Sequence, residues 1–428
     1  ELCAEHGLRL AAGRLAYFSH WLTPVGRPKR FDTRFFIAEA PRGQEASHDD
    51  QEIVEQQWLR PADALARSDA LRLMTPTVKT LETLARFDGV QALLDWTRRP
   101  REILRIMPRI GVGSLGQRPV TPDEPAFAEL GRIDPEGTGT ASYEIRTGEP
   151  VRLSPRVIRV SAGNGSVMTG PGTNTYLVGG GPNDAWAVID PGPLDAEHVE
   201  NILAAAPGPI RWIFATHTHT DHSPAAVPLA ARTGAAVHGR IADHREWQDA
   251  SFAPQVLLGG GERFTLDEGV TLRAIHTPGH ASNHLCYLLE EERTLFTGDH
   301  VMQLSTVVIN PPDGDMAAYL ESLRELLELE LDWLAPGHGF LMAEPARALK
   351  HIIDHRLRRE GKVVDALRAL GVAPADALLA RVYDDVPQHM HAMALRSLKA
   401  HLDKLRRDAR AQELDGAWRL VSQSPAKL

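Results

Sequence analysis

The stretch Thr216–Ser223 constrains this chain most, because it places four side chains that can bind a metal within six residues. Neutral imidazoles and ionised carboxylates are the usual protein ligands of zinc and related cations. Residues two apart on an extended chain share a face, so we expect His217 and His219 to bind one ion. Asp221 and His222 are displaced from that pair and are available to a second ion. The alternative is a His-rich polar surface loop, but this density of ligands argues against it.

Three later apolar segments also end in a residue that can bind a metal. These residues are His280, Asp299 and His338, and each lies next to glycine or proline, which allow the backbone to turn sharply. Each alone is typical of an ordinary loop. Together and in this order, they indicate strand ends that meet at one metal site. His300 directly follows Asp299; the family resemblance described below places it outside the ligand positions and implies a supporting residue.

The composition is that of a soluble globular protein of about three domains. The 428 residues are 43% hydrophobic and 24% charged, and they contain no apolar run long enough to span a bilayer. The two cysteines, Cys3 and Cys286, cannot form a disulfide framework, which favours a reducing compartment. We therefore expect a cytoplasmic protein without a membrane partner.

The net charge of −9 is distributed unevenly along the chain. Residues 151–350 carry 13 basic and 24 acidic side chains, whereas residues 351–428 carry 14 basic and 10 acidic ones. The acidic middle suits a carboxylate-containing metal site and repels a polyanion. The basic tail is consistent with a polyanion partner and equally with an ordinary solvated face.

The first hundred residues have a mixed α and β pattern. Strands are predicted over 14–21 and 31–38, and Pro61 and Pro76 are typical of the first turn of helices. Residues 101–150 are rich in Gly and Pro and predict an extended connector, with short strands over 103–106 and 143–146.

Residues 1–100 resemble the back half of a Nudix domain near the coenzyme A pyrophosphatases. The stretches that carry the resemblance are Glu1–Leu8, Trp21–Pro24, Pro28–Phe36 and Trp58–Pro61. Ala4 stands where the first Glu of the Mg²⁺-binding pair is expected, so Glu5 remains alone. The resemblance implies a partial, inert Nudix-like segment. The alternative is an α/β accessory module with no such ancestry.

Residues 151–345 predict a domain with sheets packed between helical layers, because short strand patterns alternate with helices there. The His-x-His-x-Asp-His motif, followed by a His, an Asp and a His, resembles the metallo-β-lactamase superfamily. The resemblance implies an αββα sandwich over this range. It also implies two zinc ions per chain, with manganese or iron as alternatives, and a hydroxide that bridges them. The implied first-ion ligands are His217, His219 and His280; the second-ion ligands are Asp221, His222 and His338; and Asp299 bridges.

Within that superfamily, three stretches resemble the lactamase-beta-2-like branch, whose animal member is a single-strand-specific endoribonuclease. They are Gly170–Gly179, Thr277–His284 and Phe296–Asp299. Asn174, in the first of them, is a candidate substrate-binding residue. The chain departs from true β-lactamases because no cysteine lies near the ligand set.

The tail, residues 346–428, predicts three helices followed by a hairpin. Leucines recur at steps of three and four in the third helix, and Asp415-Gly416 is typical of a tight turn. This order resembles the winged-helix domain of the same branch. Arg406, Arg407 and Arg410 are candidate phosphate-binding residues. The alternative is a packing domain or homodimer contact that shapes the mouth of the site.

The predicted function is a dinuclear zinc hydrolase in which Asp221 and Asp299 are catalytic as well as ligands. The favoured substrate is single-stranded RNA, cleaved at phosphodiester bonds by a metal-bridging hydroxide. The alternative is a glyoxalase II-like thioesterase or a lactonase with the same metals, which the ligands cannot separate from a nuclease. A third hypothesis, a nucleic-acid-binding or scaffolding protein, is opposed by the complete ligand set.

Overall fold

The computed structural model describes residues 5, 7, 12–40, 43, 55–303 and 306–421, and the chain divides into two compact units, residues 1–143 and 144–428. Most of the Glu1–Leu8 stretch, including Ala4, lies outside the described residues. Within the described part, no helix has the length and apolar character needed to cross a membrane.

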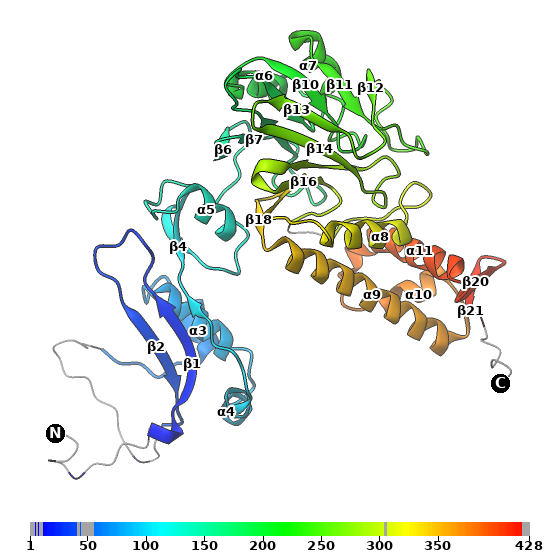
Figure 1. Cartoon of the computed structure of the whole chain (residues 1–428). Helices are drawn as coiled ribbons and strands as arrows, with labels where there is room; N and C mark the ends of the chain where they lie inside the picture. The colour runs from blue at the N-terminus through cyan, green and yellow to red at the C-terminus, as the bar shows by residue number, and fades with distance from the viewer. Residues whose placement is uncertain are drawn as a thin grey trace. The chain divides into compact units, whose positions relative to one another are not determined.

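The first unit contains a small mixed sheet with the strand order β2-β1-β3 (Figure 1). Its elements are η1 (Ala12–Arg14), β1 (Ala16–Leu22), β2 (Asp32–Ile37), α2 (Pro61–Ala66), α3 (Thr75–Leu84), α4 (Val90–Arg98) and β3 (Arg105–Ile106). Proline does stand in the first turn of α2 and α3. Phe18 of β1 packs against Trp96 of α4, with ring centroids 6.1 Å apart. The predicted strands and helix starts of this part are therefore confirmed.

The stretch 101–150, expected as an extended connector, contains regular structure. It includes a hairpin of β4 (Arg109–Gly113) and β5 (Gly116–Val120), and helix α5 (Phe127–Ile133). The expected strand over 143–146 is absent from this described stretch, where Ser142 makes only an isolated bridge to Val112. The prediction underestimated this region because its apolar residues Ile110, Val120 and Leu130 are far apart in the sequence, and their burial is visible only in the fold.

The second unit is built on two sheets. The first has the order β12-β11-β10-β9-β8-β7-β6, and the second β13-β14-β15-β16-β17-β18. The strands of the first are β6 (Val151–Ser154), β7 (Val157–Ser161), β8 (Asn174–Val178), β9 (Trp186–Ile189), β10 (Ile210–Phe214), β11 (Ala236–Gly239) and β12 (Val256–Leu257). Those of the second are β13 (Arg263–Asp267), β14 (Val270–His276), β15 (Leu285–Leu289), β16 (Thr294–Gly298), β17 (Trp333–Pro336) and β18 (Met342–Ala343).

Helices cover the outer face of each sheet (Figure 1). Helices α6 (Ala196–Ala205) and α7 (Ala226–Thr233) pack on the first sheet, and α8 (Met316–Leu327) and α9 (Pro345–Leu370) on the second. Successive strand residues point to opposite faces, so apolar residues on the inner faces hold the two sheets together. Tyr176 contacts Phe296 and Phe214 contacts Tyr287, with ring centroids 5.0 and 5.2 Å apart. This arrangement is the expected αββα sandwich.

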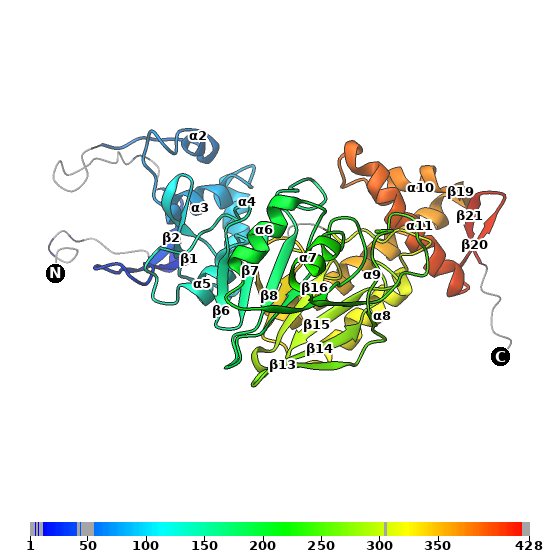
Figure 2. The same ribbon diagram turned by 90° about the horizontal axis from the view of Figure 1, so that it is seen from above.

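The tail folds as three helices and a hairpin, as predicted, with one additional short strand. After α9 come β19 (Val372–Pro374), α10 (Ala375–Val382), α11 (His391–Arg407), β20 (Ala411–Leu414) and β21 (Ala417–Leu420). Figure 2 shows α10, α11 and the hairpin grouped at one end of the unit. Leu398, Leu402 and Leu405 of α11 are fully buried in a separate core with Val363 and Leu367 of α9. Helix α9 therefore belongs to both cores and joins the sandwich to the winged helix.

Candidate metal centre

The predicted ligands converge because they follow strands that end at one edge of the sandwich. The His-rich loop follows β10, His280 follows β14, Asp299 follows β16 and His338 follows β17. Their ligand atoms form three overlapping groups, within each of which all atoms lie within 4.8 Å of one another. The groups are His217, His219 and His280; His217, His222 and Asp299; and Asp221, His222 and His338.

Three imidazoles form the first half of the centre. His219 Nδ1 lies 3.0 Å from His217 Nε2 and 3.0 Å from His280 Nε2. Three ring nitrogens at this spacing converge on one point, as an open three-ligand metal site requires.

Two imidazoles and a carboxylate form the second half. Asp221 Oδ2 lies 3.4 Å from His222 Nε2 and 3.4 Å from His338 Nε2. The Asp221 side chain is 25% exposed, whereas both histidines are buried. Asp221 is therefore the ligand of this half that faces the solvent-accessible side.

Asp299 lies between the two halves, and its two carboxylate oxygens face different sides. Oδ2 is 3.7 Å from His280 Nε2, whereas Oδ1 is 3.4 Å from His222 Nε2 and 3.2 Å from His338 Nε2. This geometry suits a carboxylate that bridges two cations.

Outer hydrogen bonds orient four of the five imidazoles by their Nδ1 atoms, which leaves Nε2 directed into the centre. The pairs are His217 with Thr216 Oγ1 (3.0 Å), His222 with Asp190 Oδ2 (2.9 Å), His280 with the Val308 carbonyl (2.7 Å) and His338 with the Gly172 carbonyl (3.1 Å). Such outer partners fix the tautomer and the ring orientation of metal-binding histidines.

Sequence reasoning did not identify Asp190 as a site residue. Asp190 is 2% exposed and has a φ of 51°, a left-handed conformation that is uncommon outside glycine. Its carboxylate accepts hydrogen bonds from the Thr216 amide (2.7 Å) and the Thr216 hydroxyl (2.8 Å). The only signal in the sequence was an acidic residue at the end of the apolar run 186–189.

The histidines of the two halves differ in pKa because their charged neighbours differ. Burial, followed by the neighbouring histidines, lowers the pKa of His217 well below its ordinary value, and burial first lowers the pKa of His219 to about 3. Burial also acts to lower the pKa of His338, but the carboxylates of Asp299 and Asp221 outweigh it and raise that pKa to about 9. The carboxylate-rich half therefore retains protons that a cation can replace.

The donor set fits a pair of metal ions. Among the described side chains, the buried atoms His222 Nε2 and Asp299 Oδ1 have no hydrogen-bond partner. Buried polar atoms are rarely left without a partner, and these two point at each other across the second half. A cation between them satisfies both.

His300 lies outside the ligand set, as interpreted from the sequence. It is fully buried, and its ring packs 4.8 Å from the Tyr319 ring and 5.5 Å from the His284 ring. The Tyr319 hydroxyl donates to the His300 carbonyl at 2.9 Å. These contacts anchor the backbone beside Asp299.

The structure places Asn174 beneath the centre and away from any open surface. Asn174 is fully buried, and its amide donates to the carbonyls of Pro336 (3.0 Å) and Gly339 (2.8 Å). It therefore positions the loop that carries His338, and the expectation of direct substrate contact is corrected because no face of this side chain is open.

The three candidate arginines of the tail are each paired with an acidic residue of the same chain. Arg406 lies 2.7 Å from Asp403, Arg407 pairs with Asp315 at the start of α8, and Arg410 lies 2.5 Å from Glu360. These carboxylates neutralise the positive charge of the three arginines, which therefore attracts phosphate less. None of the three is among the residues that line the pocket at the metal centre.

The metal centre opens into a pocket of about 780 Å³ within the second unit. His219, Asp221, His280, Asp299 and His338 lie in its wall. Residues of α9, α11 and the loop before α11 also line it, so the winged helix helps to enclose the pocket. Its apolar lining includes Met168, Trp247, Met302, Val307, Met390 and Met393.

Two family profiles match this chain. The profile of the metallo-beta-lactamase superfamily matches residues 168–338, and that of the beta-lactamase associated winged helix domain matches residues 375–418. Both ranges lie in the second unit, and neither profile supports the Nudix-like resemblance of residues 1–100.

Three relatives illustrate the similarity. The chain is 33% identical over 254 residues to an atrochrysone carboxyl ACP thioesterase of Aspergillus chevalieri. The aligned region covers 57% of this chain and 78% of that protein. The chain is 36% identical over 220 residues to a protein of the same name from Aspergillus fumigatus, with coverages of 50% and 66%. A beta-lactamase-like protein 2 homolog of Drosophila melanogaster is 29% identical over 278 residues, with coverages of 60% and 90%.

Solved structures share the fold. A metallo-beta-lactamase family protein from Thermus thermophilus superposes with a TM-score of 0.53 at 20% identity, covering 63% of this chain and 100% of that chain. A beta-lactamase domain protein from Burkholderia ambifaria gives 0.55 at 18% identity, with coverages of 65% and 95%. At these identities, the likeness concerns the fold alone.

Proposed function

The chain belongs to the metallo-beta-lactamase superfamily of hydrolases, and from that premise we propose that it is a dinuclear zinc enzyme that hydrolyses thioesters. The observation that carries the proposal is the pocket at the metal centre. It is large and mainly apolar, and methionine and tryptophan side chains line it together with the ligand cluster. Such a wall suits an acyl chain better than a ribose-phosphate backbone.

The relatives support a carbonyl substrate. The two Aspergillus proteins are named as thioesterases that act on an acyl carrier protein, and one of them matches over 78% of its own length. The assignment of zinc rests on the donors, five imidazoles and two carboxylates, since nitrogen-rich sites of this kind suit zinc.

Each half of the centre has a distinct part in binding the metals. His217, His219 and His280 would hold one ion, Asp221, His222 and His338 the other, with Asp299 shared. When bound, two such ions polarise the scissile carbonyl and lower the pKa of water, so that hydroxide is available near neutral pH.

Asp221 is the group best placed to orient the attacking water. Although burial acts to raise the pKa of Asp221, the charge of His222 and the close approach of the His222 and His338 rings, each with Nε2 3.4 Å from Asp221 Oδ2, hold that pKa below its ordinary value. The carboxylate is therefore ionised at neutral pH and accepts a hydrogen bond. Water adds to the thioester carbon and releases a proton to solvent, the carbon–sulfur bond breaks, and the thiolate takes up a proton from solvent in the open pocket.

Cleavage of single-stranded RNA is the second candidate function. The resemblance to the lactamase-beta-2-like branch and the winged helix favour it. Two observations weigh against it: the acidic residues outnumber the basic ones over 151–350, and Arg406, Arg407 and Arg410 are already in ion pairs. A lactone is a third substrate class with the same carbonyl chemistry.

A substrate panel distinguishes these functions. Zinc-loaded protein is assayed on an acyl N-acetylcysteamine thioester, a γ-lactone and a single-stranded RNA oligonucleotide, next to Asp221→Ala. We expect thioester hydrolysis that Asp221→Ala reduces at least about 100-fold, since ligand and water orientation are lost together. RNA cleavage that is lost in Asp221→Ala, without thioester turnover, would instead establish the nuclease.

Three further expectations stay proposals. The segment 1–100 is proposed to be a partial, inert Nudix-like module, supported by its mixed sheet and by helices that begin at proline. The proposals of a cytoplasmic location and of a homodimer rest on the sequence alone. A pyrophosphatase assay, fractionation of cells and light scattering of the purified chain test them in turn.

A further inference from the structure

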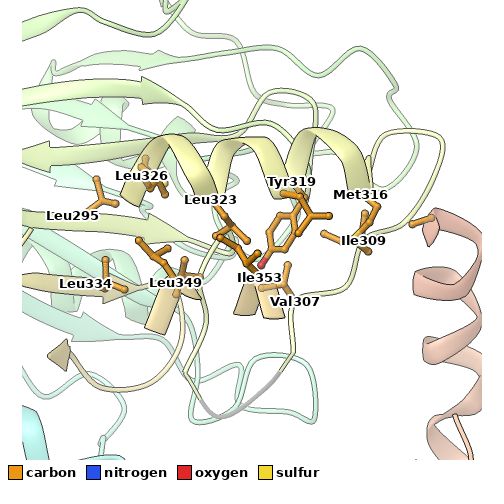
Figure 3. Packing of buried hydrophobic residues seen from close by; sticks show 14 of the residues in the cluster. Leu295, Val307, Ile309, Met316, Tyr319, Leu323, Leu326, Leu334, Leu349 and Ile353 are labelled. Carbon is orange, nitrogen blue, oxygen red and sulfur yellow. The ribbon is translucent and has the colours of Figure 1, made fainter. Parts of the chain in front are cut away.

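Arg356 of α9 is a buried cation without an acidic partner. It is 3% exposed, and among the described residues no carboxylate lies within 4.0 Å of its guanidinium. One terminal nitrogen donates to the Val307 carbonyl, the guanidinium lies 5.4 Å from the centre of the Tyr319 ring, and Nε has no hydrogen-bond partner among the described atoms. Figure 3 shows Val307 and Tyr319 close together beneath α8.

The neighbouring buried arginine shows what a compensated position looks like. Arg359, one turn along α9, lies 2.7 Å from Asp385 and donates to the Val382 carbonyl at 2.6 Å. Glu360 is spaced to pair with Arg356 on the helix, but it lies instead 2.9 Å from Lys404 and 2.5 Å from Arg410. Among the described residues, no acidic side chain therefore balances the charge of Arg356.

The positive field of Arg356 reaches its neighbours. After burial, the charge of Arg356 is the largest cause that lowers the pKa of His355, and the same order of causes lowers the pKa of His401 to about 3. A buried charge costs several kcal/mol unless a counter-charge or hydrogen bonds satisfy it. The site is thus prepared for an anion that the described part of this chain does not supply.

Arg356 also lies in the wall of two cavities, one of which is at the metal centre. It lines the same pocket as His280 and Asp299. The carbonyl that it holds belongs to Val307, and the next carbonyl, of Val308, accepts from His280 Nδ1. An anion on Arg356 would therefore lie in the same cavity as the scissile bond, in contact with a segment that orients a metal ligand.

We propose that Arg356 is the anion-binding residue of the substrate pocket, and that it selects thioesters whose acyl part carries a carboxylate. A planar guanidinium matches a carboxylate with two parallel hydrogen bonds. This inference rests on the proposed function and adds the class of acyl group that the site takes.

Two pairs of probes test the proposal and locate the anion. Glutaryl and valeryl N-acetylcysteamine thioesters differ in the terminal carboxylate, and the matching coenzyme A thioesters add phosphates on the carrier side. For zinc-loaded full-length chain, we expect kcat/KM at least tenfold higher for glutaryl than for valeryl, with either carrier. Preference for coenzyme A at equal acyl group, without glutaryl preference, would place the anion on the carrier and overturn the carboxylate assignment.

Variants isolate the role of the charge. Arg356→Gln is expected to raise KM for the glutaryl substrate at least tenfold more than KM for the valeryl substrate, whereas Arg356→Lys restores part of the glutaryl preference. Arg358→Gln, exposed on the same helix, is the matched control and changes neither. Equal losses on both substrates would show that Arg356 only supports the fold or His280, and would overturn the proposal.

A binding measurement separates this inference from the proposed function. Glutarate is titrated calorimetrically into wild type and Arg356→Gln, with bound zinc counted in both. Glutarate binding that Arg356→Gln weakens at least tenfold at equal zinc content supports the anion site even if no thioester is cleaved. Thioester turnover with equal glutarate affinity in the two proteins leaves the proposed function intact and overturns the anion site.

Discussion

The Asp190 carboxylate lies 2.9 Å from His222 Nδ1, on the side of the ring opposite the metal centre. The same carboxylate accepts both the amide and the hydroxyl hydrogen bonds of Thr216, whose hydroxyl in turn lies 3.0 Å from His217 Nδ1. One buried acid therefore orients a histidine from each half of the centre. It also helps to raise the pKa of His222, together with Asp221 and Asp299 and against burial.

Asp190→Asn is expected to weaken metal binding about 10–100-fold, the usual effect of removing an outer partner of a ligating histidine. The amide cannot accept from the Thr216 amide, the Thr216 hydroxyl and His222 together. Competition with a chromogenic chelator measures the affinity. Asp376→Asn, at an exposed position of α10, is the control and should bind metal like wild type; unchanged affinity in Asp190→Asn would refute the orienting role.

The clustering of the His and Asp side chains of the centre was predictable from sequence because they lie in a dense local motif and at three strand ends next to glycine or proline. Asp190 was not, since a single acid after an apolar run has many uses. The role of Asn174 was misjudged for a related reason. Its motif indicated function, but only the fold reveals that its amide holds the carbonyls of Pro336 and Gly339.

Gly279→Ala is expected to disturb His280. Gly279 has a φ of +144°, and an added Cβ would lie 2.4 Å from Tyr319 Cα, a backbone atom that cannot move aside. We expect a loss of about 2 kcal/mol or more in the free energy of unfolding and a lower affinity for the first metal. Chemical denaturation and metal counting measure these effects.

The matched control for that substitution is Gly361→Ala in the middle of α9. Nothing lies within 4 Å of the added Cβ there, so a gain of about 0.5–1 kcal/mol in stability is expected from helix propensity. If Gly279→Ala caused no loss in the free energy of unfolding, the close packing of Tyr319 against the His280 loop would be contradicted.

Sequence patterning predicted the strands, helices and tail well where the periodicity was strong, as in the leucine stripe of α11. It failed for the hairpin β4–β5 and for α5, because glycine and proline in that region suggested an irregular connector. The tail arginines show a different limit. Their positive charge was visible, but Asp315 is about ninety residues from Arg407 along the chain, and only folding brings the pair together.

Arg410→Ala is expected to destabilise the winged helix by about 1 kcal/mol, a modest value because the arginine is partly exposed. Its partner Glu360 is buried and keeps Lys404 as a second cation. Urea denaturation compares the variant with Lys399→Ala, an exposed control on α11. Loss of RNA binding with no change in stability would instead support the earlier prediction of a phosphate-binding residue.

Acidification is expected to destabilise the fold through His401. Burial first, then the charge of Arg356, lowers the pKa of His401 from 6.5 to about 3, and neither ring nitrogen has a hydrogen-bond partner among the described residues. Below pH 6.5, His401 binds a proton in the unfolded chain but stays neutral in the folded chain. Stability therefore falls as pH falls through the window from 6.5 to about 3, on the order of 1.4 kcal/mol per pH unit from this residue.

Denaturation of wild type and His401→Met at pH 7.5 and pH 5 measures this contribution. The variant should lose less stability than wild type on acidification, and His389→Met, at an exposed position of the same domain, should behave like wild type. Parallel pH profiles for wild type and His401→Met would contradict the assignment of a neutral buried imidazole.

The central claim is a thioester hydrolase that depends on two metal ions, and a zinc titration of chelator-stripped protein tests it most directly. The rate of thioester hydrolysis is followed as zinc is added to wild type and to Asp299→Ala. We predict no turnover without metal, a rise that saturates near two equivalents per chain in wild type, and little turnover at any zinc level in Asp299→Ala. Full thioester hydrolysis by the stripped protein, or an undiminished rate in Asp299→Ala, would contradict the account.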